Sequence, residues 1–208
     1  MQARELVVAL QGFGPFATFR ENPSQQIVED LLKNPPWTGL RLVGKVLPVT
    51  QAGVGEIPAL VRNWEPDVWI GVGLAAGRAR VSVERIAVNL SHYEQPDEDG
   101  AVVHDAEVVE GGPAAYRSSL PDRTIAAAWA AADIPGQVSY SAGTFLCNQA
   151  FYLARHTVDA TGRDVRTGFV HIPATVGMGR RTDPALPYGV VRQAVILAVE
   201  ETVRAIHA

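Results

Sequence analysis

The sequence predicts a single-domain α/β protein whose helices cover both faces of a central sheet, and three observations indicate this fold class. The chain has 208 residues, a length typical of one domain. Apolar residues make up 47% of the sequence and charged residues 19%, a composition that excludes a disordered chain. Short β-branched runs alternate with stretches of helical periodicity, as in sheets whose strands are joined by crossover helices. Because the sequence contains no internal repeat and no linker, we expect one domain over residues 1–208.

The expected strands are short apolar runs bounded by glycine, proline or polar turn residues. They cover residues 6–10, 40–49, 68–72, 81–90, 138–141 and 168–172. The first expected helix opens at Asn22-Pro23-Ser24, because asparagine is a favourable N-cap and proline suits the first turn, and it ends at Pro35. Further helices with apolar residues at helical spacing are expected at residues 54–64, 125–132, 145–156 and 190–206. Residues 91–115 are rich in Asp, Glu, Gly and Pro, so we expect a long loop with room for a short hairpin.

Charge, cysteine content and hydropathy exclude several classes of protein. The net charge is −4, the pI is about 5.7 and no basic stripe is present, so nucleic-acid binding is not expected. Cys147 is the only cysteine, which excludes an intrachain disulfide and the secreted disulfide scaffolds. No segment reaches the roughly 20 apolar residues of a membrane span, and the apolar run near the N-terminus is too short for a signal peptide. We therefore expect a cytoplasmic protein that does not bind membranes.

The first candidate functional segment is the run Gly-Phe-Gly-Pro-Phe-Ala at residues 12–17, directly after an expected strand. Its G-x-G-x-x-A spacing is that of a dinucleotide-binding loop, with acidic residues further along the chain. However, Pro15 lacks a backbone donor, and Phe13 and Phe16 are bulky where a phosphate loop must stay open. Two alternatives remain: a strand-terminating turn with two core aromatics, or two rings at a strand end that enclose a small flat ligand.

The second candidate is Cys147 in the run Ser-Ala-Gly-Thr-Phe-Leu-Cys-Asn at residues 141–148. A strand ends there, a glycine turn follows, and a helix begins near the thiol. Backbone N–H groups and the helix dipole at such a position favour a thiolate, and the same donors can hold an oxyanion. The alternative is a buried, unreactive cysteine, which is a common environment for this residue.

His171 is the third candidate, because an apolar strand presents it just before Pro173. The ends of strands carry the sites of open α/β sheets, although a histidine buried in the core would show the same pattern. The remaining histidines lie in loops or at helix ends and are expected to be ordinary surface residues: His92, His104, His156 and His207. Since no Cys/His or His/carboxylate cluster has ligand spacing, we expect no metal site.

Glu84 is the fourth candidate, because a carboxylate within an apolar strand is costly unless it is paired. It either forms an ion pair with Arg85 or another arginine, or orients His171 and stabilises its imidazolium. A glycine-rich loop at residues 71–78 follows the preceding strand. This loop can supply backbone donors, and its Arg78 can raise the local positive potential.

Taken together in chain order, these motifs resemble the pyroglutamyl-peptidase I (pyrrolidone-carboxylate peptidase) family of cysteine peptidases. Any single motif is weakly specific, whereas the ordered set is strongly specific. The resemblance spans residues 6–173, and more loosely the last helix. The motifs that carry it are GFGPF at 12–16 with NPS at 22–24, GVG at 71–73 with GR at 77–78, SVERIAVN at 82–89, SAGT at 141–144 with CN at 147–148, and HIP at 171–173.

The resemblance implies a Cys-His-Glu triad of Cys147, His171 and Glu84. The implied reaction is hydrolysis of the amide bond after an N-terminal pyroglutamate, through an acyl-enzyme and without a cofactor. The family's fold is one α/β/α domain with a central twisted, mostly parallel but mixed sheet. Its members often form homo-oligomers, so a dimer or tetramer is expected by resemblance.

The resemblance also implies the residues that bind the substrate. Pyroglutamate is a small neutral lactam, which needs an apolar pocket and a few polar partners for its ring N–H and C=O. Phe13 and Phe16 match the family's ring-clamping aromatics. The other residues expected to line the pocket are Leu74, Phe145 and Leu146, and those expected to give oxyanion or electrostatic support are Arg78 and Asn22.

The chain departs from the family pattern at three places. Ala17-Thr18 replaces two glycines, Leu74 stands where many members have glutamine, and residues 174–179 replace an aromatic followed by Pro-Glu-Gln. The altered loop after Pro173 motivates an alternative in which the same triad hydrolyses another lactam or small cyclic amide. A non-catalytic ligand-binding relative is the third hypothesis, against which the intact triad argues.

Overall fold

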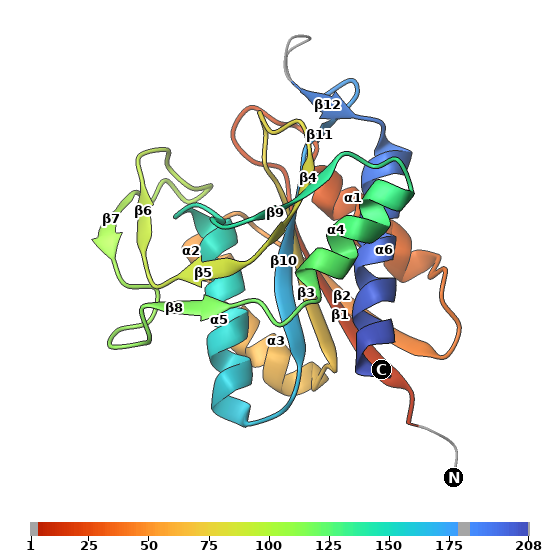
Figure 1. Ribbon diagram of the computed structural model, residues 1–208. Coiled ribbons are helices and arrows are strands. Elements are labelled where there is room, and N and C mark those ends of the chain that lie inside the picture. Colours follow the sequence, from red (N-terminus) through yellow and green to blue (C-terminus); the bar gives the residue numbers. More distant parts are fainter. Residues whose placement is uncertain (1–3, 179–183, 208) are drawn as a thin grey trace.

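The computed structural model of the protein describes residues 4–178 and 184–207. Its centre is a six-stranded sheet with the strand order β2-β1-β3-β10-β4-β9 (Figure 1). The strands are β1 (Leu6–Phe13), β2 (Leu40–Leu47), β3 (Val68–Leu74), β10 (Arg166–Ile172), β4 (Val81–Glu84) and β9 (Gly136–Ser139). The strands β2, β1, β3 and β10 are parallel, whereas β4 and β9 run in the opposite direction. The prediction of a mostly parallel, mixed sheet is confirmed.

Helices cover both faces of this sheet (Figure 1). One layer contains α1 (Pro23–Lys33), α4 (Asp122–Ala131) and α6 (Tyr188–Ile206), and the other contains α2 (Gln51–Gly55), α3 (Ile57–Trp64) and α5 (Leu146–Thr161). The predicted α/β/α sandwich is thus confirmed. Among the described helices, none has the length and apolar character that a transmembrane segment requires.

Side chains along each central strand point alternately to the two faces of the sheet. Each face therefore forms a hydrophobic core with the helices that cover it. Val72 and Val170 are fully buried in the core beneath α1, α4 and α6. Phe169, one residue before Val170, belongs to the opposite core beneath α2, α3 and α5, as does Trp69. Because successive residues of a strand point to opposite faces, apolar runs in β3 and β10 are what a sheet covered on both sides requires.

Two expected elements are divided in the structure. The helix expected at residues 54–64 begins earlier, where the Thr50 side chain caps Gly53 N–H, and is split into α2 and α3. Pro58, at the start of α3, lacks the N–H that a continuous helix would need. The strand expected at residues 81–90 is divided at Arg85 into β4 and β5 (Ile86–Val88), because β5 leaves the main sheet and pairs with β8 (Ala115–Arg117).

The segment at residues 91–115 contains a hairpin of β6 (Ser91–Tyr93) and β7 (Val103–Ala106), which lies at the edge of the molecule beside α5 (Figure 1). The short pair β11 (Ala174–Thr175) and β12 (Ala185–Leu186) follows β10 and was not predicted. Such short pairings depend on contacts between distant segments, so the local sequence carries little signal for them.

Candidate active site

The candidate side chains gather at the carboxyl ends of β1, β3 and β10, next to the N-terminus of α5 (Figure 1). The connection from β1 leads to β2 on one side, whereas β3 lies on the other side of β1. Open α/β sheets bind ligands outside their carboxyl ends at such a reversal of strand order. The topology therefore accounts for a site built from the turn after β1, the end of β3 and the end of β10.

Strand register places Glu84 beside His171. Glu84 of β4 is paired with Phe169 of the antiparallel strand β10, and His171 lies two residues further along β10, on the same face. The His171 Nδ1 and Glu84 Oε1 atoms are 2.7 Å apart, and both side chains are buried. The carboxylate therefore fixes the orientation of the imidazole and directs its Nε2 away from β4.

Arg78 is the second partner of this carboxylate. Its Nη1 donates to Glu84 Oε1 at 2.7 Å, and its Nη2 donates to the carbonyl of Ser141 at 3.2 Å. The neighbouring Arg85, one of the partners that the sequence allowed for Glu84, instead forms an ion pair with Asp122. The positive charge beside Glu84 thus comes from Arg78, which lies in the glycine-rich loop that follows β3.

The charged form of Glu84 is favoured despite complete burial. Burial alone raises the pKa of this carboxyl group, but its hydrogen bond and attraction to His171, aided by Arg78, bring the pKa below its usual value. Glu84 therefore stays ionised at neutral pH and stabilises a positive charge on the imidazole.

Cys147 is the second residue of α5 and lies above the sheet next to Gly73 of β3. A Cβ built on Gly73 would be only 2.9 Å from Cys147 Sγ, so only glycine leaves room for the thiol there. Gly73 is also the residue of β3 paired with His171 in β10. Because Gly73 lies next to both residues, the Cys147 thiol and the His171 imidazole are at the same end and on the same face of the sheet.

The surroundings of Cys147 favour the neutral thiol, contrary to the expectation that the helix N-terminus favours a thiolate. Burial and the negative charge of Glu84 raise the pKa of Cys147 to about 12, and the opposing effect of Arg78 is smaller. The desolvation of the thiolate outweighs the helix dipole, since the dipole contributes only a fraction of a unit charge. Ionisation of Cys147 therefore needs a proton acceptor at hand.

A cavity of about 380 Å³ opens in front of Cys147. Its volume is in the range of small-molecule sites, and its lining is mostly apolar. All five residues predicted to bind substrate line this cavity, together with Asn22 and Cys147: Phe13, Phe16, Leu74, Phe145 and Leu146. Thus the structure brings the predicted pocket and the predicted nucleophile together.

Aromatic rings form one wall of the cavity. The rings of Phe16 and Phe145 have centroids 5.2 Å apart, and Tyr93 of the β6–β7 hairpin packs edge-on against Phe145 at 4.7 Å. Six further residues line the cavity and were not among the predicted site residues: Ala17, Thr18, Phe19, Val49, Ala76 and Gln95. Phe19 lies three residues after Phe16 and exchanges two backbone hydrogen bonds with it, a spacing typical of a tight turn.

Asn22 holds the turn that carries the phenylalanines. Its Oδ1 accepts hydrogen bonds from the backbone N–H and the hydroxyl of Ser24, and its Nδ2 donates to the carbonyl of Gly14. The N–H of Phe13 donates to Ser24 Oγ, and that of Gly14 donates to Leu47 O. Because these backbone donors are used inside the fold, the loop lacks the open cradle that a dinucleotide phosphate requires.

The comparisons with known proteins agree with this geometry. The pyroglutamyl peptidase family matches residues 6–205. A pyrrolidone-carboxylate peptidase of Coprothermobacter proteolyticus is 36% identical over 197 residues, which cover 93% of this chain and 95% of that protein. A pyrrolidone-carboxylate peptidase of Thermococcus kodakarensis is 40% identical over 167 residues, 80% of each chain.

Solved structures of the same kind of protein share the fold. A mutant pyrrolidone carboxyl peptidase of Pyrococcus furiosus superposes with a TM-score of 0.92 at 32% identity, covering 97% of this chain and all of that one. The enzyme of Thermococcus litoralis gives a TM-score of 0.92 at 30% identity, with 97% and 95% of the two chains covered. The family prediction made from the motifs is confirmed: the chain belongs to the pyroglutamyl peptidase family of cysteine peptidases.

Proposed function

We propose that this protein removes N-terminal pyroglutamate from peptides, with Cys147 as nucleophile, His171 as proton acceptor and donor, and Glu84 as the residue that positions His171. The observation that carries the proposal is the joint position of these groups. The nucleophile lines an apolar cavity of suitable size, and the buried His171–Glu84 pair lies at the same end of the sheet.

In the proposed mechanism, His171 Nε2 takes the thiol proton while Cys147 Sγ attacks the carbonyl carbon of pyroglutamate. The C–N bond then breaks, and the imidazolium returns the proton to the departing amine. Water, deprotonated by His171, attacks the thioester, which releases pyroglutamate and restores the thiol. Glu84 stabilises the imidazolium in both half-reactions, because it is ionised and 2.7 Å from Nδ1.

The first turn of α5 is the proposed oxyanion site. The first N–H groups of a helix have no partner within it, and Leu146 and Cys147 are the first two residues of α5. Their N–H groups lie next to the attacking sulfur. The expected contribution of such donors is about 2.7–4 kcal/mol each.

The lining of the pocket fits a lactam better than a charged amino terminus. Phe13, Phe16 and Phe145 enclose an apolar space, and no described carboxylate lines it to pair with an ammonium group. Asn22 and Gln95 are the lining residues with amide groups that a lactam can meet. A prolyl residue carries a charged secondary amine in place of the neutral lactam N–H, so we expect the pocket to reject it.

The decisive assay measures release of a fluorescent amine from pyroglutamyl, prolyl and alanyl amides, with wild type and Cys147→Ser. Turnover of the pyroglutamyl amide alone, absent in Cys147→Ser, is expected. Equal turnover of the prolyl amide would contradict the proposed specificity, and activity retained by Cys147→Ser would contradict the nucleophile.

A second candidate function is hydrolysis of another lactam or small cyclic amide by the same residues. It is favoured by Leu74, which is apolar where many family members carry glutamine and which lines the cavity. The altered loop at residues 174–179 is the other reason, and of that loop the structure describes residues 174–178. Failure of the pyroglutamyl amide, combined with turnover of a larger lactam by wild type but not Cys147→Ser, would favour this candidate.

Oligomeric state and location are parts of the same proposal. We expect a homodimer or homotetramer, by analogy with the family, and light scattering on the purified protein tests it. We also expect the protein in the cytoplasm, because its single thiol Cys147 must stay reduced for activity. Fractionation of cells that produce the protein tests this location.

A further inference from the structure

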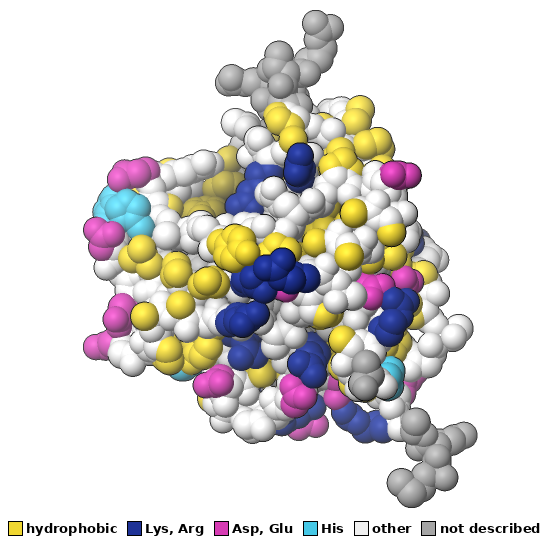
Figure 2. All heavy atoms as spheres, viewed as in Figure 1, with side chains coloured by type: hydrophobic (Ala, Val, Ile, Leu, Met, Phe, Trp, Pro, Cys, Tyr) yellow, Lys and Arg dark blue, Asp and Glu magenta, His cyan; other side chains and the backbone are white. Residues whose placement is uncertain are grey.

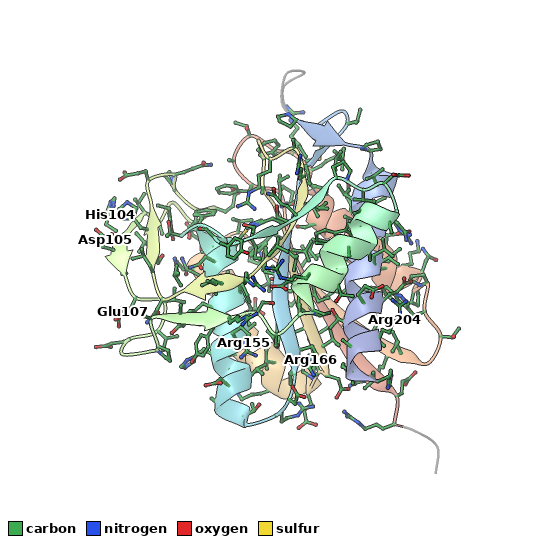
Figure 3. The ribbon with its side chains drawn as sticks, in the orientation of Figure 1. His104, Asp105, Glu107, Arg155, Arg166 and Arg204 are labelled. Atoms are coloured by element: carbon green, nitrogen blue, oxygen red, sulfur yellow. The ribbon has the colours of Figure 1, made fainter. Side chains whose placement is uncertain are left out.

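The β6–β7 hairpin carries a group of potential metal ligands that the proposed peptidase mechanism does not use, although the sequence indicates no metal site and places His92 and His104 among the ordinary surface residues. His92, Glu94 and His104 each offer one ligand atom, and these three atoms lie within 4.8 Å of one another. Figure 2 shows histidine and acidic side chains side by side at this edge of the molecule, and Figure 3 places His104 and Asp105 on β7. Two histidines and a carboxylate form a donor set that Zn²⁺ prefers.

A β-bulge brings these side chains to one face of the hairpin. Ser91 pairs with Ala106 and Tyr93 pairs with Val103, so the single residue His92 faces two residues of β7, namely 104 and 105. Bulges of this kind redirect side chains. Glu94 follows β6 directly, at a bend, and its Oε1 lies 3.7 Å from His104 Nδ1.

Asp105 supports the site without being one of the three ligands. Its Oδ1 lies 2.9 Å from His92 Nδ1, which fixes the tautomer and leaves His92 Nε2 to bind a cation. Asp105 has a φ of 48°, a left-handed conformation that side-chain-bearing residues rarely adopt. Two adjacent residues of the bulge therefore serve the site. His104 provides a ligand, and Asp105 provides the carboxylate that orients His92, another ligand.

The backbone of this hairpin is fixed, whereas the ligand side chains can move. His92 N–H donates to the carbonyl of Thr144, and the Thr144 hydroxyl donates back to the carbonyl of His92. The side chains of His104 and Glu94 are 58% and 80% exposed, and His104 Nδ1 is 3.7 Å from Glu94 Oε1. Tetrahedral Zn²⁺ bonds of about 2.0–2.1 Å require ligand atoms about 3.4 Å apart, so small rotations of exposed side chains complete the geometry.

We propose that His92, Glu94 and His104 form a Zn²⁺ site on the β6–β7 hairpin, with Asp105 orienting His92 and water completing the coordination. Tyr93, between two of the ligands, packs against Phe145 in the wall of the substrate cavity. Bound zinc would therefore cross-link β7 to β6 and the residue after it, next to the Tyr93 side chain that supports the aromatic wall of the cavity.

Binding is tested by calorimetric titration of Zn²⁺ into tag-free protein that carries Cys147→Ser, so that the thiol cannot act as a ligand. One site per chain is expected. His104→Gln should weaken binding at least tenfold, and Asp105→Asn by about 10- to 100-fold, since loss of an orienting carboxylate has this effect. The matched control is His207→Gln, which changes an exposed histidine at the end of α6 and should leave the affinity unchanged.

A second readout identifies the coordination directly. Co²⁺ bound in place of Zn²⁺ should show the visible absorption of a four-coordinate site, and His104→Gln should remove it. Thermal unfolding with Zn²⁺ present should occur at a higher temperature than without it, again only when His104 is intact. The absence of one-to-one binding, or binding that survives His104→Gln at full affinity, would overturn the proposal.

Discussion

The rate at which Cys147 reacts with an alkylating reagent tests the proposed proton transfer to His171. Burial and Glu84 raise the pKa of this thiol from 9.0 to about 12. In the variant His171→Asn, the side-chain amide can still donate to Glu84, but it cannot accept a proton. Ionisation of the thiol must then release its proton to water, at the full cost of burying the thiolate.

The size of the effect follows from these two pKa values. At pH 8, a thiol with a pKa of 9.0 is about 10% ionised, whereas one with a pKa of about 12 is about 0.01% ionised, a ratio of about 10³. The more basic thiolate is about tenfold more nucleophilic, because reactivity rises with basicity with a coefficient of about 0.4. The variant should therefore react about 10²-fold more slowly than an unhindered cysteine.

The assay follows incorporation of iodoacetamide by intact-protein mass, and Cys147 is the only cysteine that can react. The reference is the same chain unfolded in urea, which exposes the same thiol. Wild type should react at least tenfold faster than His171→Asn at pH 7, and the rate of the variant should rise about tenfold per pH unit up to pH 10. A folded variant that reacts at pH 8 within threefold of the unfolded chain would refute the reasoning.

Three further predictions concern the surroundings of the nucleophile. Arg78→Gln removes a cation that lowers the pKa of Glu84, so this pKa should rise and the acid limb of the kcat/KM profile should move to higher pH. An unmoved acid limb would argue that Arg78 does not influence the titration that limits activity. Gly73→Ala places a methyl group 2.9 Å from Cys147 Sγ, and should lower kcat at least tenfold and destabilise the fold by about 1–3 kcal/mol in urea unfolding; unchanged kcat would show that the thiol tolerates displacement. Phe16→Ala opens the aromatic wall and should raise KM about tenfold with a smaller change in kcat, whereas a loss confined to kcat would place Phe16 outside substrate binding.

The elements that carry the site were largely predictable from local sequence, because their signals are local. Asn22 and Pro23 mark the start of α1, and Asn22 caps it in the structure. The apolar run that delivers His171 forms β10, and the glycine turn before Cys147 leads into α5. In each case a short run of residues both forms the element and places the functional group at its end.

The partners of Glu84 could not be predicted in the same way. The sequence shows a carboxylate in an apolar strand and several arginines, but the choice among them depends on long-range pairing. β4 pairs with β10 in antiparallel register, which brings Glu84 to His171, 87 positions away in the sequence. Arg85 is adjacent in sequence, yet it pairs with Asp122 and leaves Arg78 for the carboxylate.

The protonation state of the thiol could not be predicted from the local sequence, for a related reason. A helix N-terminus next to a cysteine favours a thiolate, and that signal is visible in the sequence. Desolvation depends on what covers the residue, namely the sheet below Cys147 and the aromatic wall of the cavity. The larger effect therefore comes from tertiary packing, which residues 141–148 alone do not specify.

A neutral thiol beside a charged carboxylate is consistent with efficient chemistry, because the proton need move only within the site. Glu84 and Arg78 form an ion pair and already compensate each other's charge. The proposed proton transfer creates a thiolate and an imidazolium together, and Glu84 Oε1, 2.7 Å from His171 Nδ1, is placed to stabilise the imidazolium. When a substrate carbonyl is bound, the proposed mechanism passes the negative charge from sulfur to the carbonyl oxygen, for which the first N–H groups of α5 are the proposed donors. In this mechanism the thiolate is thus needed only when an acceptor for its charge is bound.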